Sequence, residues 1–572
     1  MSSIYSLKIK HFRGIEDFEQ TFGDKHCIVI IGRGDSGKST ILKAISLVLS
    51  PVWNNVFSDL DFTNRDITRP IEIEAIVKNV PNELMSLDKY GEYCQLLTAK
   101  GITSNMVDEN AHQEDAVLKI RLTVDETLEP KWTVVSDREI GEKIISHTDR
   151  AKLNMFMISD YIDGQFAFSK GSPLYSTFNK NISKEDRKAS EKELLNIVRN
   201  AYNEIEKINV FNKFDEATNK IKINANKLGL NIDNLKTNVE FRDNAYSGGN
   251  ITLHSDDIPF RLKGKGSKRL LSMAIQYTLI QDGGIVLIDE IEQGLESDRA
   301  RNITRLLARS SNGQVFITTH SKDVVLEPKA EQIFLMKKNL EHLLSFDKGL
   351  QGMLRAHPDA FFARRIISCE GATEEGIIRA FSDNLQENRG YGIAVQGIVD
   401  IDGGGSEKFY KFAEALKEKG FDVLIFCDDD ARNLDVLYEK ALKDGIVVVK
   451  CDKNFAIEQQ LFKDLPWKAV CELIEYALNE HDGVKKILPI DGYKYSTANE
   501  LFNAPHEEQN KLRELLANSA KANTNNGGWF KCINHGEFVG RIWIKYLDEL
   551  SDECTLKKEY KEIIKWIGDG IN

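Results

Sequence analysis

The sequence has no long apolar run, no signal-peptide core and no excess of basic residues. No run approaches the roughly 18 apolar residues that a membrane span requires, so we expect no association with a membrane. The N-terminus enters a predicted strand at Ile4, without the apolar core of a signal peptide, which predicts a cytoplasmic protein. The formal net charge of −12 argues against a protein that coats nucleic acid, although it does not exclude DNA binding at a local basic groove.

The eight cysteines are scattered and include no C-x-x-C pair. Several stand in apolar, strand-like runs, which favours buried reduced thiols over disulfides or a structural zinc site. The sequence also lacks a low-complexity tract, a fixed-period repeat and a long Gly/Ser linker, so we expect its units to pack together. A chain of 572 residues is too long for one core, and roughly 100–200 residues per domain predicts three or four units.

The clearest motif is a phosphate-binding loop near the N-terminus. The sequence fits G-x-x-x-x-G-K-[S/T] between an apolar strand at 28–31 and an apolar helix at 40–49. Its glycines let backbone N–H groups surround the β-phosphate, Lys38 adds a charge for the β and γ oxygens, and the Ser39 hydroxyl suits Mg²⁺. The predicted nucleotide-binding residues are Gly32, Gly34, Asp35, Ser36, Gly37, Lys38, Ser39 and Thr40.

Further along the chain, three features suit the same chemistry. Gly264 and Gly266 precede a predicted helix and offer backbone amides to a phosphate. Taken alone, such a segment favours a plain loop, and only its position before the next motif favours a phosphate contact. An apolar strand ends in Asp289 and Glu290, which is typical of a Walker B strand. In that pattern the aspartate holds the Mg²⁺ shell and the glutamate polarises the attacking water. Another strand ends at His320, and a lone histidine at a strand end is more often structural.

Two further sequence patterns occur in the first half of the chain. Alternating apolar and polar residues at 4–12, 71–77 and 118–124 predict an antiparallel sheet beside the nucleotide-binding strand. From about 184 to 228, long charged stretches predict an inserted helical unit, for which dimerisation is a hypothesis. The apolar residues at helical spacing there are Leu194, Leu195, Ile197, Val198, Ala201 and Ile205.

Acidic residues follow two apolar strands in the second half of the chain. The strand at 365–369 is followed by Glu370, with Glu374 four residues on, and the strand at 421–427 is followed by Asp428 and Asp430. The two aspartates lie two residues apart on an extended end, so their side chains point the same way. Since open α/β sheets place their sites at the carboxyl ends of strands, these oxygens could hold Mg²⁺ or Mn²⁺. Solvated loop ends are the alternative.

The ordered phosphate loop, glycine-rich segment, Asp-Glu strand and histidine resemble the ABC-type ATPase heads of SMC and RecF-like proteins. Residues 294–298 occupy the place of the D-loop. In that family the glycine-rich signature of one head contacts the γ-phosphate held by a second head, so the resemblance implies ATP, Mg²⁺ and a homodimer or higher oligomer. A Q-loop glutamine is not evident, and Asp59, Asp61 or Asp66 lies in its place.

The two acidic strand ends also resemble a Toprim domain, the βαβ, Rossmann-like metal fold of topoisomerases, primases and some nucleases. Between them lie the glycine loop at 402–405 and an amphipathic helix with Phe409, Phe412 and Leu416. An ABC-type head followed by Toprim is similar to the OLD (overcoming lysogenisation defect) family of nucleases over nearly the whole chain. The resemblance implies an α/β protein whose ATPase head comprises 1–160 and 241–348. The inserted helical dimerisation unit is 161–240, and Toprim with a C-terminal helical extension is 349–572.

Two softer matches complete the resemblance. Residues 454–458 resemble the family's later acidic position, at Glu458, and residues 527–531 resemble the segment that carries its catalytic lysine, at Lys531. Each residue is otherwise an ordinary solvated side chain. The implied catalytic residues are Glu290, His320, Glu370, Asp428, Asp430 and Lys531. The implied metal ligands are Ser39 and Asp289 at the nucleotide, and Glu370, Glu374, Asp428, Asp430 and Glu458 for two ions of Mg²⁺ or Mn²⁺.

The sequence therefore predicts an ATP-binding and ATP-hydrolysing DNA endonuclease or nickase that uses Mg²⁺ or Mn²⁺ to activate water. A role in prokaryotic defence against phage, with a regulatory protein or RNA partner, is implied by the resemblance alone. The alternative is an ATP-driven DNA-binding or repair clamp without cleavage. A topoisomerase requires a nucleophilic tyrosine near the acids and a primase requires template-binding features, and neither is identified. An ABC transporter subunit is least favoured, because Toprim has no place there.

Overall fold

The computed structural model divides the chain into two compact units, Met1–Leu354 and Arg355–Asn572. The division into four parts expected from the sequence stays a prediction. The structure describes residues 2–52, 55–98, 101–103, 116–158, 214–230, 232–240, 250–259, 262–281, 283–338, 340–405, 407–430, 434–480, 498–521 and 528–568.

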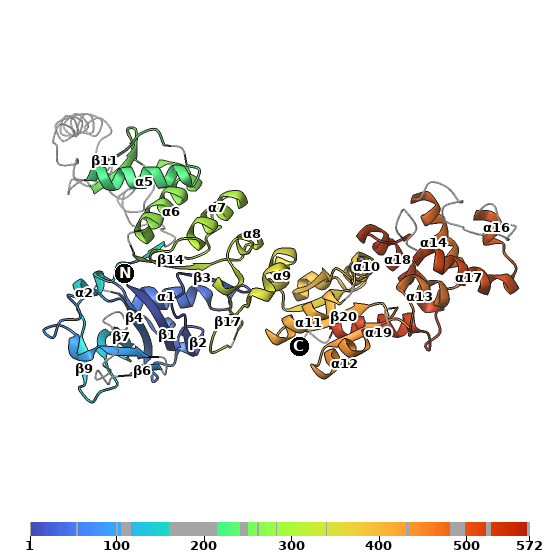
Figure 1. Cartoon of the computed structure of the whole chain (residues 1–572), viewed down its shortest axis with the longest axis horizontal. Helices are drawn as coiled ribbons and strands as arrows, with labels where there is room; N and C mark the ends of the chain where they lie inside the picture. Colours follow the sequence, from blue (N-terminus) through green and yellow to red (C-terminus); the bar gives the residue numbers. More distant parts are fainter. Residues whose placement is uncertain are drawn as a thin grey trace, which may run out of the picture. The chain divides into compact units, whose positions relative to one another are not determined.

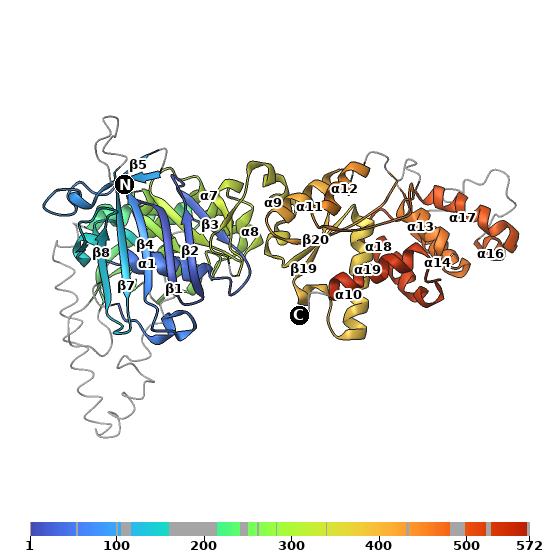
Figure 2. The ribbon, with the colours of Figure 1, turned by 90° about the horizontal axis from the view of Figure 1, so that it is seen from below.

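An antiparallel sheet forms one layer of the N-terminal unit, which confirms the sheet predicted there. Its strand order is β2-β1-β4-β7-β5-β6, and β8 pairs with β7 and β9. Figure 2 shows β8, β7, β4, β1 and β2 running side by side. The strands are β1 (Ser3–Phe12), β2 (Ile15–Thr21), β4 (Ile71–Lys78), β5 (Gln95–Thr98), β6 (Gly101–Thr103), β7 (Ala116–Val124), β8 (Pro130–Val135) and β9 (Glu142–Ile144).

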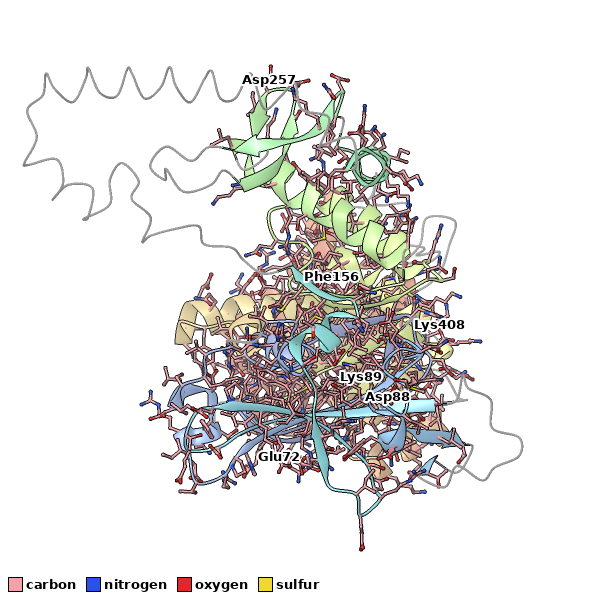
Figure 3. The ribbon with its side chains drawn as sticks, turned by 90° about the vertical axis from the view of Figure 1, so that its left-hand side faces the viewer. Glu72, Asp88, Lys89, Phe156, Asp257 and Lys408 are labelled. Atoms are coloured by element: carbon pink, nitrogen blue, oxygen red, sulfur yellow. The ribbon has the colours of Figure 1, made fainter. Side chains whose placement is uncertain are left out.

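The two faces of this sheet differ because apolar and polar residues alternate along its strands. In β4 every second residue from Ile71 onward is buried. Glu72 lies on the outer face, where Figure 3 labels it, and pairs with Lys10 at 3.7 Å. On the same strand Glu74 accepts a hydrogen bond of 2.6 Å from Arg121 Nε. The outer face is therefore solvated and charged, and the inner face belongs to the core.

A mostly parallel sheet forms the second layer, in the order β10-β14-β15-β3-β16-β17, with β17 antiparallel. Its strands β3, β14 and β15 are buried throughout, since helices or the other sheet cover both faces. One apolar core joins α1 (Lys38–Val48) to both sheets, and Figure 1 shows α6 (Lys265–Gln281) and α7 (Ser297–Ala308) on the other side of β14. The strands are β3 (Cys27–Ile31), β10 (Met155–Ile158), β14 (Ile285–Ile288), β15 (Gln314–Thr318), β16 (Ile333–Leu335) and β17 (Leu344–Ser345).

The predicted helical unit at 161–240 is described only at its end. There α5 (Asp215–Lys227) is helical as expected, but β11 (Leu235–Glu240) is a strand. This strand pairs with β12 (Asn250–Ser255), which pairs with β13 (Ile258–Pro259) in a small antiparallel sheet. The apolar positions from Leu194 to Ile205 lie outside the described residues, so dimerisation through this unit stays a prediction.

The C-terminal unit contains a parallel sheet in the order β19-β18-β20-β21. The strands predicted at 365–369 and 421–427 are confirmed as β18 and β20, which occupy the buried centre. Helices α10, α11 and α12 follow β18, β19 and β20 in turn, as in successive βαβ units. The bounds are β18 (Arg365–Cys369), α10 (Ala372–Arg389), β19 (Ile398–Asp402), α11 (Lys408–Glu418), β20 (Asp422–Cys427), α12 (Asp435–Lys443) and β21 (Val447–Lys450).

The sequence from about 350 to 363 favours one helix, and this prediction is wrong. The chain forms α9 (Gln351–Ala356) and a separate 3₁₀ helix at Pro358–Phe362. Pro358 has no N–H to continue the helical ladder, and a proline also disfavours helical backbone in the residue before it. His357 accordingly has φ −133° and ψ 61°, outside the helical region.

The rest of the C-terminal unit is helical and shares one apolar core with β18 and β20. Close approach of α10 to α18 depends on glycine at both helices. A Cβ on Gly376 would lie 2.2 Å from the Ile533 carbonyl oxygen, and one on Gly536 would lie 2.2 Å from the Thr373 carbonyl oxygen. The helices are α13 (Ile457–Asp464), α14 (Trp467–Glu480), α16 (Ala498–Phe502), α17 (His506–Lys521), α18 (Ile533–Lys545) and α19 (Thr555–Gly568).

Glu559 of α19 places a carboxyl group in this core. It is 3% exposed, and neither oxygen has a hydrogen-bond partner in the described part of the chain. Burial raises the pKa of Glu559 well above its usual range. The folded state therefore keeps a proton that the unfolded state releases above about pH 4.3, so this group lowers stability as the pH rises toward its folded pKa.

Glu559→Gln should stabilise the protein, because the amide stays neutral at every pH. We expect the melting temperature to rise by about 2–4 °C or more near pH 8, and by much less near pH 5. Differential scanning calorimetry on metal-free protein measures both values, with Glu562→Gln as the exposed control on the same helix. An equal shift at both pH values would show that Glu559 is ionised in the folded protein.

Candidate nucleotide and metal sites

The phosphate loop joins β3 to α1 through backbone that glycine makes accessible. Gly32 has φ 148°, and a Cβ there would lie 2.3 Å from the Met336 carbonyl oxygen. Gly37 precedes α1 with φ 100°, and Asp35 also has a positive φ of 57°. Any side chain at Gly32 would push the loop away from the end of β16. Packing therefore requires the motif's first glycine, which also leaves the loop's backbone N–H groups open to a phosphate.

Lys38 points back into the loop at the start of α1. Its Nζ donates hydrogen bonds to the carbonyl oxygens of Gly32, at 2.9 Å, and Arg33, at 2.8 Å. Burial lowers the pKa of Lys38 to about 8, while the nearby charges of Glu290 and Asp289 oppose this shift. The ammonium is thus held by carbonyl oxygens where the motif expects phosphate oxygens.

The ends of β14 and β15 meet the phosphate loop at one edge of the sheet. Ser39 Oγ donates to Asp289 Oδ1 at 3.0 Å, and the Thr318 hydroxyl donates to the same carboxylate oxygen. Thr318 Oγ1 also accepts a hydrogen bond of 2.9 Å from the Glu290 backbone N–H. The two residues expected to hold Mg²⁺ are therefore in contact, and Thr318 fixes the strand end that carries both acids.

Glu290 has φ 46°, an uncommon conformation for a residue with a side chain. The backbone is held there by Thr318 on the N–H side and by Arg269, whose Nη2 donates to the Glu290 carbonyl at 3.1 Å. Such a conformation persists only where surrounding contacts fix it, and it often marks a functional site. His320 Nε2 lies 4.0 Å from Glu290 Oε1.

Glu292 holds the histidine strand end in place, a role that the sequence did not suggest. Its carboxylate accepts hydrogen bonds from Thr319 Oγ1 and from the His320 backbone N–H, both at 2.7 Å. The spacing of two residues between Glu290 and Glu292 is the only sequence signal for it. The positions of Glu290 and His320 thus depend on β14, β15 and this connection together.

The signature glycines start α6 as predicted. Gly264 accepts the helical hydrogen bond from Lys268 N–H at 3.0 Å, and a Cβ on Gly266 would lie 3.5 Å from the Gly294 carbonyl oxygen. The signature and the D-loop position therefore touch within one chain. The contact of Gly264 and Gly266 with ATP on a second head stays a prediction.

The acids in the place of a Q-loop take part in local ion pairs. Asp61 Oδ1 pairs with Arg13 Nε at 2.9 Å, and Asp66 Oδ2 pairs with Arg69 Nε at 3.1 Å. Arg13 stands in the turn between β1 and β2. Ile15, the first residue of β2, lies next to the phosphate loop, because a Cβ on Gly37 would be 3.9 Å from its Cγ1. The antiparallel sheet therefore reaches the phosphate loop, but a residue that couples it to ATP is not identified.

The second site lies at the carboxyl ends of β18 and β20. One ligand oxygen from each of Glu370, Asp428 and Asp430 falls within 4.8 Å of the others. The Asp428 N–H donates to Glu370 Oε2 at 2.9 Å, and the Ile457 N–H donates to Asp428 Oδ1 at 2.6 Å. Adjacent parallel strands and the start of α13 thus bring together three acids predicted from separate segments.

The intervening Asp429 points elsewhere, as the alternation of an extended chain predicts. Its Oδ2 lies 3.3 Å from Lys450 Nζ. The nearby glycine loop also follows from close packing, because a Cβ on Gly403 would lie 2.1 Å from Phe409 Cβ. Gly405 N–H donates to the Glu370 carbonyl at 2.8 Å, so this loop supports the end of β18.

Burial and the charges of neighbouring acids raise the pKa of Glu370, Asp428 and Glu374. Burial is the main cause that raises the pKa of Glu370, and the charge of Asp430 adds to it. The pKa of Asp428 is raised well above its usual range by burial and by the charges of Glu374, Glu458 and Glu370. Burial raises the pKa of Glu374 to about 8. A divalent cation would relieve this repulsion and release protons.

Glu374 and Glu458 lie outside the three-acid cluster. Glu374 Oε2 accepts a hydrogen bond of 3.0 Å from Gly371 N–H and so caps α10. Glu458 is fully buried, which rules out the solvated alternative for it. Its Oε1 lies 2.6 Å from Lys531 Nζ, and its Oε2 has no hydrogen-bond partner in the part of the chain that the structure describes. Both acids nevertheless lie close enough to raise the pKa of Asp428.

Lys531 reaches the cluster from the segment before α18. Its side chain is 48% exposed, while Trp529 and Phe530 beside it are buried in the core. Thr373 Oγ1 donates to the Phe530 carbonyl at 2.6 Å, which ties this segment to α10. Burial would lower the pKa of Lys531, but the charges of Glu458 and Asp428 outweigh that effect and raise it.

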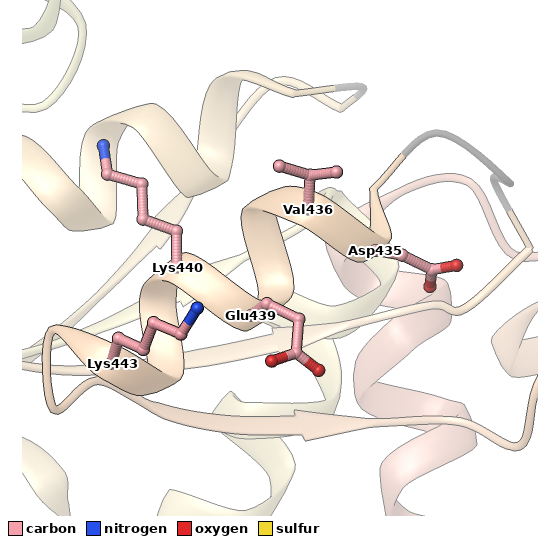
Figure 4. A pocket seen from close by; sticks show the side chains of 5 residues that line it. All are labelled: Asp435, Val436, Glu439, Lys440 and Lys443. Atoms are coloured by element: carbon pink, nitrogen blue, oxygen red, sulfur yellow. The ribbon is translucent and has the colours of Figure 1, made fainter.

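Among the residues that the structure describes, no further group of three or more acidic, histidine or cysteine side chains converges in this way. A shallow hollow over α12 is lined by side chains of that helix alone, and the two lysines and two acids in it suit ordinary solvation (Figure 4). The eight cysteines are free thiols, five of them buried. Within the described ranges, no helix combines the length and apolar character that crossing a bilayer requires.

Two family models match the chain. Residues 3–325, more than half of it, match the model described as AAA ATPase domain, and residues 361–430 match the one described as overcoming lysogenization defect protein-like, TOPRIM domain. A curated relative, the OLD nuclease of Thermus scotoductus, is 44% identical over 70 residues. That match spans 12% of this chain and 13% of the relative.

Solved structures of SMC heads also resemble part of the chain. The Smc head domain of Pyrococcus furiosus, bound to the C-terminal domain of ScpA, covers 62% of this chain and 98% of its own at 14% identity and TM-score 0.37. The SMC head domain of Thermotoga maritima covers 60% and 99% at 12% identity and TM-score 0.29. These scores are too low to define the fold, which the strand orders of the two units define directly.

Proposed function

Because this chain belongs to the AAA ATPase family and continues into an OLD-like TOPRIM domain, we propose that it is an ATP-regulated nuclease that cuts DNA. Cleavage takes place at the strand ends of the C-terminal unit with Mg²⁺ or Mn²⁺. The observation that carries the proposal is the convergence of Glu370, Asp428 and Asp430, with ligand oxygens within 4.8 Å.

The donor set fits a hard divalent cation. All of its ligand atoms are carboxylate oxygens, which Mg²⁺ and Mn²⁺ prefer to nitrogen or sulfur. The buried Glu458 Oε2, which lacks a hydrogen-bond partner in the described part of the chain, offers a further oxygen close by. A bound ion supplies positive charge to the phosphate and lowers the pKa of water. Glu370, Asp428 and Asp430 would hold one ion, and Glu374 and Glu458 would be the ligands available to a second.

Lys531 supplies the remaining positive charge. Cleavage of a phosphodiester builds negative charge on the phosphate oxygens, which a positioned cation stabilises. The lysine is half exposed, and the buried Trp529 and Phe530 fix the backbone that carries it. Its pair with Glu458 holds the ammonium beside the acids until a phosphate is present.

Lys531→Ala should lower the rate of DNA cleavage by about 10²–10³-fold, the scale of removing one donor to transition-state charge. ATP turnover should persist, because Lys531 belongs to the C-terminal unit. Lys531→Arg should rescue only part of the rate, because the guanidinium is larger and directed differently. Single-turnover nicking at saturating Mn²⁺ is the measurement.

The matched control is Lys463→Ala, a lysine that is 51% exposed and pairs with Asp452 in the same unit. A parental rate for Lys531→Ala would assign this residue to the surface. A loss as large for Lys463→Ala would show that any lysine of the unit matters through general charge.

The N-terminal unit hydrolyses ATP and controls the nuclease. Lys38 and the loop amides bind the phosphates, Ser39 and Asp289 hold Mg²⁺, and Glu290 orients water, with His320 beside it. The signature at Gly264 and Gly266 completes the site of a second copy, so two heads enclose ATP in a homodimer. A cytoplasmic role in defence against phage, with a protein or RNA regulator, rests on the resemblance to OLD proteins.

Incubation of the purified full chain with supercoiled plasmid and Mn²⁺ tests the proposal. Open-circular or linear product that requires Asp428 supports a nuclease. DNA binding without any product would favour the clamp instead.

A further inference from the structure

A second lysine contacts the metal cluster directly. Lys521, the last residue of α17, places its Nζ 3.0 Å from Asp430 Oδ2. The two side chains are 35% and 28% exposed, so both are accessible to solvent. Neither the motif pattern nor the resemblance pointed to Lys521, since it lies ten residues before Lys531 on a helix without a motif.

A neutral residue of α13 also holds this lysine. Gln459 Oε1 lies 3.4 Å from Lys521 Nζ and accepts a hydrogen bond of 3.0 Å from the Ala456 N–H. The Gln459 amide donates to Asn518 Oδ1 at 3.0 Å, which ties α13 to α17 one turn before Lys521. The lysine would therefore keep one partner at the site if Asp430 turned to another cation.

The same end of α17 is fastened to the segment that carries Lys531. Trp529 N–H donates to the Ala520 carbonyl at 3.0 Å, and a Cβ on Gly528 would lie 2.8 Å from that carbonyl oxygen. Both lysines are thus positioned by one backbone junction. Each is paired with a different acid of the site, Lys521 with Asp430 and Lys531 with Glu458.

We propose that Lys521 holds Asp430 in the metal-free protein, gives it up to the incoming divalent cation, and then binds a phosphate of the DNA. The inference rests on the proposed function, because it requires a metal at Glu370, Asp428 and Asp430. An ammonium has three N–H donors and a flexible stem, so it can leave a carboxylate for a phosphate without backbone movement.

The exchange has a physical reason. Without metal, the clustered carboxylates repel each other, and an ammonium on Asp430 offsets part of that repulsion. A divalent cation in the cluster repels the ammonium and attracts the carboxylate more strongly, since its charge is doubled. The released lysine would keep its contact with Gln459 and could bind a phosphate of a DNA backbone that approaches the cluster.

Metal binding tests the first half of the proposal without cleavage. Lys521→Gln should bind Mn²⁺ about threefold to tenfold more tightly than the parent, because the metal no longer displaces a partly exposed ion pair. Isothermal titration of the full chain without nucleotide or DNA measures this, with Asp428→Asn as the blank for other sites. Lys463→Gln, which removes a lysine from Asp452, should leave the affinity unchanged, and Lys521→Arg should not tighten it.

DNA binding tests the second half. In Ca²⁺, Lys521→Gln should bind a fluorescein-labelled duplex more weakly, and the slope of log K against log salt should become shallower by about 0.9, the value for one lost phosphate contact. The parent and Lys463→Gln should share the steeper slope.

The outcomes separate this inference from the proposed function. If Mn²⁺ binding by the parent equals that of Asp428→Asn, the cluster holds no metal and the proposed function itself is refuted. If the parent binds Mn²⁺ and Lys521→Gln binds it equally or more weakly, the lysine does not compete with the metal. If Lys521→Gln binds Mn²⁺ more tightly but keeps the salt slope of the parent, the transfer of Lys521 from Asp430 to a DNA phosphate is refuted.

Discussion

Asp428→Asn is expected to abolish DNA cleavage and leave ATP hydrolysis at the parental rate. Asparagine keeps the oxygen that accepts the hydrogen bond from the Ile457 N–H, at 2.6 Å in the parent, so the start of α13 should stay in place. It removes the negative charge from the centre of the three-acid cluster, where a divalent cation depends on carboxylates. Because the two sites are separate constellations in separate units, the ATPase should not respond. Plasmid nicking and phosphate release from the same preparation measure both activities.

Asp429→Asn provides the control for this result. The residue is the immediate neighbour and carries the same charge, but it pairs with Lys450 on the side away from the cluster. We expect cleavage close to the parental rate. Loss of ATPase activity in a folded Asp428→Asn protein would argue for one composite site instead of two.

Lys38→Ala should abolish ATP binding. The Lys38 ammonium points into the loop, where it donates hydrogen bonds to the carbonyl oxygens of Gly32 and Arg33. Alanine would leave those carbonyl oxygens facing the phosphates without a cation between them. Glu290→Gln should have the opposite effect, because it keeps the phosphate contacts and removes the group that orients water. We expect this variant to bind ATP and not turn it over.

Equilibrium binding of a fluorescent ATP analogue and steady-state phosphate release separate these two variants. Each serves as the other's control, since one should lose binding and the other only hydrolysis. Hydrolysis at the parental rate by Glu290→Gln would show that the assignment of β14 as the Walker B strand is wrong. ATP binding by Lys38→Ala with parental affinity would remove Lys38 from the phosphate site.

The sequence predicts the parts of both sites that depend on local chain geometry. The phosphate loop is a contiguous pattern, and its strand and helix are recognisable on either side of it. The pairing of Asp428 with Asp430, and the opposite direction of Asp429, follow from the alternation of an extended chain. Placement of Glu370 beside them follows from the rule that parallel strands share a carboxyl edge, once the resemblance places both strands in one sheet.

Residues that depend on packing between distant segments are not predictable in this way. Thr318 fixes Glu290 only because β15 lies beside β14, and Glu292 reaches the histidine only across that pair of strands. Lys521 meets Asp430 because Gln459 and Asn518 join α13 to α17. The broken helix at Pro358 is a different case, since the proline itself was a sufficient signal.

The measurement that tests the central claim most directly is the conversion of supercoiled plasmid by the purified full chain in Mn²⁺. Parent, Asp428→Asn and Asp429→Asn proteins are compared at the same concentration, after their melting temperatures have shown that all three are folded. The proposed function predicts open-circular or linear product with the parent and with Asp429→Asn, and intact supercoiled DNA with Asp428→Asn. Equal product from all three proteins, or no product from a parent that binds DNA and hydrolyses ATP, would contradict a nuclease at this site.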